Sequence, residues 1–179
     1  MNTLTLFREH RQALVKAWID EVYTTYPLDT TGFMRTQEDA FCNPVGEITT
    51  TMAGYLYDAV AGEHIIEDRV RDSLDRFVKL RSVQDFSPSQ GIGVFYLLKP
   101  LLRKVLLPKF TAAAQLSDYL EAESRLDTLA LMAFDVYIST REKLAEMRIK
   151  EIKDQHVQLV RWAQHVEGSP VGGPGGKNF

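Results

Sequence analysis

The amino-acid sequence predicts an all-α protein, and three observations lead to this expectation. Apolar residues recur at helical spacing over most of the chain, with charged residues between them. Two stretches begin with a capping side chain followed by proline, Asn43-Pro44 and Ser87-Pro88, which is a common helix start. Residues 116–166 contain neither proline nor glycine, and no segment alternates as a strand does. We expect a bundle of about five to six helices with a long C-terminal helix.

The first three helices are expected at residues 4–25, 43–62 and 66–84. Pro27 should end the first, because the residue before a proline is disfavoured in helical conformation. Asn43 should cap the second and Gly62 should end it. Each of these helices has a stripe of apolar residues at helical spacing. In the first helix the stripe comprises Phe7, Leu14, Val15, Trp18, Val22 and Tyr23. In the second helix it comprises Val45, Ile48, Met52, Tyr55, Leu56 and Ala59 or Val60, and in the third helix Ile66, Val70, Leu74, Phe77 and Val78.

The central helix should begin at Ser87, because Ser87 and Gln90 have the spacing of a capping box. Gly91 and Gly93 follow, and each costs about 1 kcal/mol relative to alanine inside a helix. We therefore expect a neighbouring element to cross closely at these glycines. Pro100 should kink this helix after residue 98 or 99, and Pro108 should end it.

The last helix is expected from about residue 116 to residue 166. Such a length far exceeds the globular average of about 11–12 residues, so it either breaks near Ser139-Thr140 or continues as a helical stem. The stem is dense in charge, which suits an exposed coiled-coil-like segment, although folding back onto the bundle is the alternative. We expect a bundle at residues 1–140, a stem at 141–167 and a flexible Gly/Pro tail at 168–179. The candidate interface residues of the stem are Ile152, Leu159, Trp162 and Val166.

Composition and charge exclude several classes of function. A formal charge of −3 and a pI near 5.8 argue against a nucleic-acid surface. No apolar run reaches the roughly 20 residues of a membrane span, and the N-terminus is charged too early for a signal peptide. The single cysteine, Cys42, excludes an intrachain disulfide. We expect a cytoplasmic protein without membrane insertion or a nucleic-acid partner.

No catalytic or nucleotide-binding motif is present, so we expect no enzyme activity. The histidines His10, His64, His156 and His165 lack metal-ligand spacing, and no metal or other cofactor is expected. Cys42 lies beside the expected positive end of a helix, which could favour a thiolate and redox sensing, although a simply buried cysteine is the more common situation.

One stretch resembles a known family. Residues 81–90, R-S-V-Q-D-F-S-P-S-Q, followed by Phe95 and Leu98-Lys99, resemble the N-terminal domain of RsbRD-type RsbT co-antagonist proteins, which are regulators of bacterial stress signalling. The upstream elements Tyr26-Pro27 and residues 41–46, F-C-N-P-V-G, resemble that family in the same order. The resemblance covers roughly residues 10–155.

The resemblance implies a globin-like, non-haem sensory domain acting through protein–protein interaction. A haem-like or other small-molecule binding protein is the alternative. In RsbR-like proteins a terminal helix leads into a STAS domain; this sequence ends before one, which suggests a sensor module alone.

Homodimerisation through the C-terminal helices is the expected association. Arg81, Gln84, Asp85 and Cys42 are candidate signal or partner residues, although Arg81 and Asp85, four apart, could simply pair to order the turn.

Overall fold

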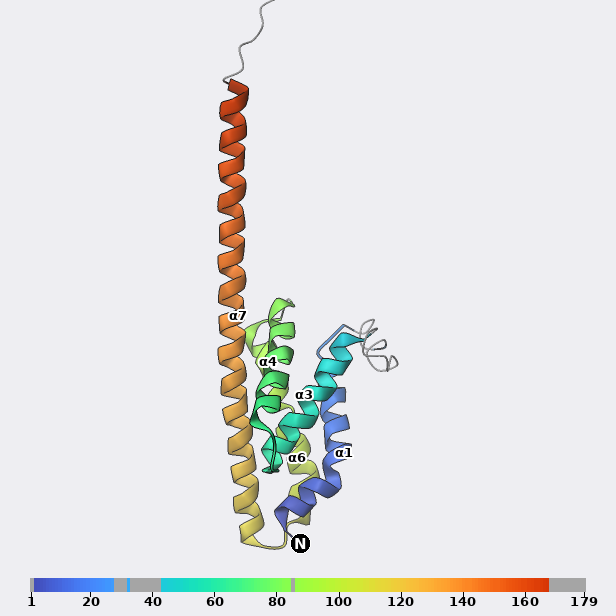
Figure 1. Cartoon of the computed structure of the whole chain (residues 1–179). Helices are drawn as coiled ribbons and strands as arrows, with labels where there is room; N and C mark the ends of the chain where they lie inside the picture. Colours follow the sequence, from blue (N-terminus) through green and yellow to red (C-terminus); the bar gives the residue numbers. More distant parts are fainter. Residues whose placement is uncertain (1, 28–31, 33–42, 85, 168–179) are drawn as a thin grey trace, which may run out of the picture. The chain divides into compact units, whose positions relative to one another are not determined.

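The computed structural model describes residues 2–27, 32, 43–84 and 86–167, with the side chains of residues 163–167 excepted. Every regular element in these ranges is helical, which confirms the all-α prediction. Helices α1, α3, α4, α5 and α6 and the start of α7 lie in one compact unit, as Figure 1 shows. That the bundle is globin-like stays a prediction.

Helix α1 spans Thr3–Tyr23, and the side chain of Asn2 caps it by accepting from the Leu4 amide. It ends slightly earlier than expected. The amides of Thr24, Thr25 and Tyr26 then bond to carbonyls three residues back, so a tightened turn continues up to Pro27. This turn holds Thr25 and Tyr26 close to the bundle.

Helix α3 spans Pro44–Ala61 and begins and ends as predicted. The side chain of Asn43 accepts from the Gly46 amide at 2.9 Å, and Gly62 has a left-handed φ of +80°. Its buried face is rotated slightly from the expected stripe. Thr49 and Tyr57 are buried, and both bond to carbonyls: Thr49 to Val45 and Tyr57 to Phe7 of α1. Hydrogen bonding allows these polar side chains inside the core.

Helix α4 spans Glu67–Val83, and its buried residues include Val70, Leu74, Phe77 and Val78 as expected. The expectation for Ile66 was wrong, since this residue precedes the first turn of the helix and its side chain is 62% exposed. The buried face continues one turn beyond the apolar residues and includes the charged side chain of Arg81.

Helix α5 spans Pro88–Tyr96, and both hydrogen bonds of the predicted capping box between Ser87 and Gln90 are present. Helix α6 spans Leu98–Leu106, with Leu97 between the two helices. The kink thus lies one or two residues before the predicted position. Pro100 explains this shift, because its ring clashes with the carbonyl four residues earlier, that of Tyr96. A short 3-10 helix, η1, spans Leu107–Lys109 and includes Pro108, which ends the segment as expected.

Helix α7 spans Ala113–Glu167 without the break considered at Ser139-Thr140. Thr140 is accommodated inside the helix, where its hydroxyl donates to the Val136 carbonyl at 2.7 Å. Within the bundle α7 buries one face, made of Tyr119, Ala122, Leu126, Ala130, Ala133 and Tyr137. The chain forms two compact units, Met1–Arg141 and Glu142–Phe179.

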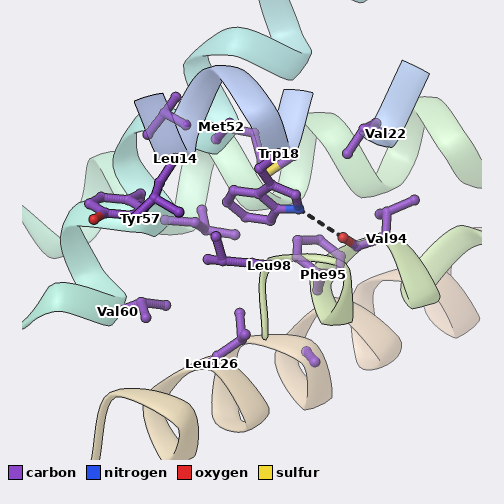
Figure 2. Packing of buried hydrophobic residues seen from close by; sticks show 14 of the residues in the cluster. Leu14, Trp18, Val22, Met52, Tyr57, Val60, Val94, Phe95, Leu98 and Leu126 are labelled. Carbon is purple, nitrogen blue, oxygen red and sulfur yellow. Dashed lines mark hydrogen bonds between the residues drawn. The ribbon is translucent and has the colours of Figure 1, made fainter. Parts of the chain in front are cut away.

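The core of the first unit is organised around Trp18, whose side chain is fully buried. Figure 2 shows its indole pointing toward the carbonyl of Val94, to which Nε1 donates at 2.8 Å. Phe95 and Leu98 approach from the central helices and Met52 from α3. Trp18 therefore fills the core and fixes α1 against α5 with one directional bond.

The two glycines of α5 differ in their surroundings. A Cβ at Gly91 would lie 2.7 Å from Cε2 of Tyr137, so α7 can approach here only because residue 91 has no side chain. A Cβ at Gly93 would meet no atom within 4 Å. The expected close crossing is thus confirmed at Gly91 and wrong at Gly93.

We predict that Gly91→Ala destabilises the protein although it improves helix propensity. Tyr137 is buried and bonded at its hydroxyl, so its ring cannot move aside, and overpacking costs about 1–3 kcal/mol against about 1 kcal/mol gained in propensity. Gly54→Ala is the control, because its Cβ would make only an ordinary contact at 3.5 Å. Urea denaturation should show a loss for Gly91→Ala and a small gain for Gly54→Ala; equal gains would contradict the crowding.

Arg103 of α6 and Glu123 of α7 form a two-pronged ion pair at 2.8 and 3.0 Å, and Tyr119 donates to the same carboxylate. Hydrogen bonding from Arg103 lowers the pKa of Glu123, and burial raises the pKa of Tyr119. A carboxylate with a lowered pKa contributes stability that is present above its unfolded value and lost as the pH falls through the folded value.

We predict that Glu123→Gln reduces the acid sensitivity of folding. The wild-type protein should lose stability below a pH of about 4.5, the ordinary value for Glu, and the variant should lose less over that range. Glu121→Gln removes an exposed carboxylate with a weak i,i+4 pair and serves as the control. The check is the urea midpoint measured from pH 6 to pH 3; parallel curves for wild type and Glu123→Gln would contradict the prediction.

Candidate functional site

The candidate site is the junction between α4 and α5, where the guanidinium of Arg81 is completely buried. Arg81 follows Leu74 and Phe77 on the buried face of α4, seven and four residues later. Its Nη1 and Nη2 atoms both donate to the Thr25 hydroxyl at 3.2 Å, and Nη2 donates to the Gln90 carbonyl at 3.1 Å. The charge is therefore held by neutral oxygens from the turn after α1 and from α5.

Aromatic rings surround the rest of this guanidinium. Its carbon lies 3.8 Å from the centroid of Phe86, 5.1 Å from that of Tyr26 and 5.8 Å from that of Phe77. Tyr26 and Phe86 also pack edge to face at 5.3 Å. Ring faces attract a cation, and the attraction is stronger where water is excluded.

The electrostatics of Arg81 are unusual for so deeply buried a cation. No carboxylate of the described residues forms an ion pair with it, and its Nε atom has no hydrogen-bond partner. Burial lowers the pKa of Arg81, and the nearby Tyr26 opposes this shift. Burial likewise raises the pKa of Tyr26. Arginine nevertheless stays protonated in proteins, so the site contains a desolvated positive charge.

Two further contacts attach the junction to its surroundings. Gln84 accepts from the Tyr26 hydroxyl at 3.2 Å, which orients the ring beside Arg81. Tyr137 of α7 donates to the Phe86 carbonyl at 2.6 Å, and Arg141 donates to the Ser82 carbonyl at 3.3 Å. The turn after α1 and helices α4, α5 and α7 thus all contribute to this junction.

The predicted site residues have different outcomes. Arg81 and Gln84 both contact Tyr26, Arg81 at the ring face and Gln84 at the hydroxyl. Asp85 and Cys42 lie outside the described residues, so an ion pair between Arg81 and Asp85 stays a prediction. The sequence did not indicate that Thr25 and Tyr137 take part in this site, nor that the buried ring of Phe77 lies beside the guanidinium. The position of Arg81 on the apolar face of α4 was a usable sign of its burial.

The described part of the chain shows no metal cluster. No group of three or more His, Cys, Asp or Glu side chains among these residues could hold a metal ion. His64 and His156 are exposed and His10 is half-buried. None of the described helices is both long and apolar enough to cross a membrane.

The structure therefore defines an all-α domain with a helical junction built around a buried cation. The sequence of this domain identifies the family to which it belongs. The chain belongs to the family described as RsbT co-antagonist protein rsbRD N-terminal domain, whose model matches residues 12–152, and this confirms the resemblance seen in residues 81–90. A protein of Archaeoglobus fulgidus described as uncharacterized is 26% identical over 151 residues, which cover 84% of this chain and 89% of the relative. No solved structure matches the chain.

We predict that Tyr137→Phe lowers the free energy of unfolding by about 1 kcal/mol, because the Phe86 carbonyl loses its donor while the ring packing remains. Tyr55→Phe removes a hydroxyl bonded only to Arg69 at the surface, and a change below about 0.5 kcal/mol is expected there. Urea denaturation of both variants checks this difference; equal effects would mean that the α7 contact does not support the junction.

Proposed function

We propose that this protein is a non-enzymatic regulatory or sensory domain that acts through protein–protein interaction in bacterial signalling. Membership of the rsbRD N-terminal domain family supports the regulatory part of this proposal. The non-enzymatic part rests on the sequence, which contains no catalytic motif. A cytoplasmic location belongs to the same proposal.

The observation that carries the interaction is a row of exposed apolar side chains in the stem. Ile152 is 65% exposed, Leu159 64% and Trp162 67%. Ala145, Ile152 and Leu159 stand seven residues apart, and Trp162 follows Leu159 by three. This is the a and d spacing of a coiled coil, in which two helices bury a common seam.

We infer that a second copy of this chain covers the seam. Identical seams pair readily about a two-fold axis. The polar residues Arg148 and Gln155 occupy d positions between the apolar ones, and such residues specify register and oligomeric state at some cost in stability. Val166 continues the spacing of seven, although its side chain lies outside the described residues.

The proposed mechanism uses the two parts of α7. Its first part contributes Tyr137 to the α4–α5 junction, and its second part carries the seam. A change at the junction that alters the position of Tyr137 would alter the pairing or tilt of the stem. The signal is thereby passed to a protein partner without any chemical step.

The experiment compares a double variant of the seam with a variant of the exposed surface of the same stem. Ile152→Asp combined with Leu159→Asp should convert a dimer to a monomer, because charges at two a positions oppose burial of the seam. Met147→Asp, at a c position with 66% exposure, should remain dimeric. Analytical ultracentrifugation measures the mass, and circular dichroism checks that the bundle stays folded.

Truncation after Arg141 tests the same proposal from another side. It retains the contacts of Tyr137 and Arg141, so a folded monomer is expected. A folded dimer after truncation would place the interface on the bundle, and a monomeric full-length chain would exclude the homodimer. Loss of folding would show that the stem belongs to the core.

A further inference from the structure

A cavity of about 390 Å³ lies beside α5 and has mainly apolar walls. The side chains of Phe86, Val94 and Leu97 form these walls, and the remaining lining residues are Thr25, Ser89, Gln90 and Gly93. Ser89 and Gln90 are exposed, so the cavity can be reached from solvent. Its volume is at the small end of the range that holds small-molecule ligands.

The lining favours a neutral ligand, because none of these residues has an ionisable side chain. The polar side chains of the lining already take part in hydrogen bonds. The Thr25 hydroxyl donates to a backbone carbonyl at 2.7 Å and accepts from Arg81 at 3.2 Å. The Ser89 hydroxyl bonds to that of Ser87 at 3.1 Å, and the Gln90 side-chain oxygen accepts from the Ser87 amide at 2.9 Å. A charged group placed against these walls would lose its hydration without gaining a counter-charge.

The missing side chain of Gly93 keeps this space open. Gly93 lies inside α5, where glycine costs about 1 kcal/mol relative to alanine, yet a Cβ there would meet nothing within 4 Å. Close packing therefore does not explain this glycine, in contrast to Gly91. Because Gly93 lines the cavity, any larger side chain at this position would occupy the cavity instead.

The backbone of Gly93 offers a ligand one polar group. In an unbroken α-helix the Leu97 amide would donate to the Gly93 carbonyl, four residues earlier. At the kink between α5 and α6 this amide instead donates to the Phe95 carbonyl. The Gly93 carbonyl thus loses the donor that a continuous helix would provide, and both Gly93 and Leu97 line the cavity. A half-buried carbonyl in this position is stabilised by a new hydrogen-bond donor.

We propose that this cavity binds a small neutral aliphatic alcohol. Its hydroxyl donates to the Gly93 carbonyl, and its hydrocarbon part packs against Phe86, Val94 and Leu97. Phe86 also connects the cavity to α7, because its carbonyl accepts from the Tyr137 hydroxyl at 2.6 Å. The role of the alcohol as the signal rests on the proposed regulatory function and deepens it. Binding is measured without reference to dimerisation, so a failure of one proposal is distinguishable from a failure of the other.

The test follows backbone amide NMR signals of the full-length chain during titration with three compounds at concentrations up to about 10 mM. Hexanol is the probe, methyl pentyl ether has the same atoms without a donor, and hexanoate has a charge. Hexanol should bind about fivefold or more tightly than the ether, because only the alcohol donates a hydrogen bond. Hexanoate should bind more weakly than hexanol near neutral pH, because its carboxylate must be desolvated.

Gly93→Leu should weaken the binding of hexanol about tenfold or more, because its side chain fills the cavity. The open space beside Gly93 allows this variant to fold. Tyr96→Leu is the matched control on the same helix; Tyr96 is exposed and does not line the cavity, so binding should be unchanged. Circular dichroism checks that each variant is folded, and the alcohol–ether comparison decides the matter if Gly93→Leu is not.

Several results would overturn the proposal. Equal binding of alcohol and ether would exclude a role for the Gly93 carbonyl, and tighter binding of hexanoate would contradict the preference for a neutral ligand. Binding that Gly93→Leu leaves unchanged would place the ligand elsewhere. A failure of hexanol to bind would reject this ligand class.

Discussion

The burial of the Arg81 guanidinium is the constraint on which the arrangement of the bundle depends. A desolvated cation must be surrounded by acceptors and ring faces, and here these come from the turn after α1, from α4 and from α5. Thr25 connects two of these elements through its side chain. Its hydroxyl donates to the Val22 carbonyl and accepts from Arg81, so one side chain ends a helix and holds a charge.

Helix α7 contributes side chains to this junction in addition to covering the bundle core. Tyr137 packs against Gly91 and donates to the Phe86 carbonyl, so its position depends on the distance between α5 and α7. The same helix carries an exposed apolar seam in the stem. This chain thus contributes to a buried polar centre of the bundle and carries a row of exposed apolar side chains on one continuous helix.

Local features of this fold could be predicted from the sequence, whereas long-range partners could not. Asn43, Ser87 and Gly62 act within a few residues of themselves, so their roles follow from spacing alone. The crowding at Gly91 comes from Tyr137 of α7, more than 40 residues away, whereas Gly93 has open space beside it, and the sequence does not distinguish the two glycines. Similarly, Arg81 and Gln84 were recognisable as candidate site residues at the junction before the capping box, but the ring contacts of Arg81 require Tyr26, whose position is fixed by tertiary packing.

The contact between Gly91 and Tyr137 has a consequence for the evolution of this family. The two positions share one small volume, so they cannot vary independently. A relative with a larger residue at position 91 must have a smaller one at position 137, and it must then satisfy the Phe86 carbonyl in another way. Substitutions at these two sites are therefore expected to arise as compensating pairs, and such covariation would mark the place where α7 meets the central helix across divergent sequences.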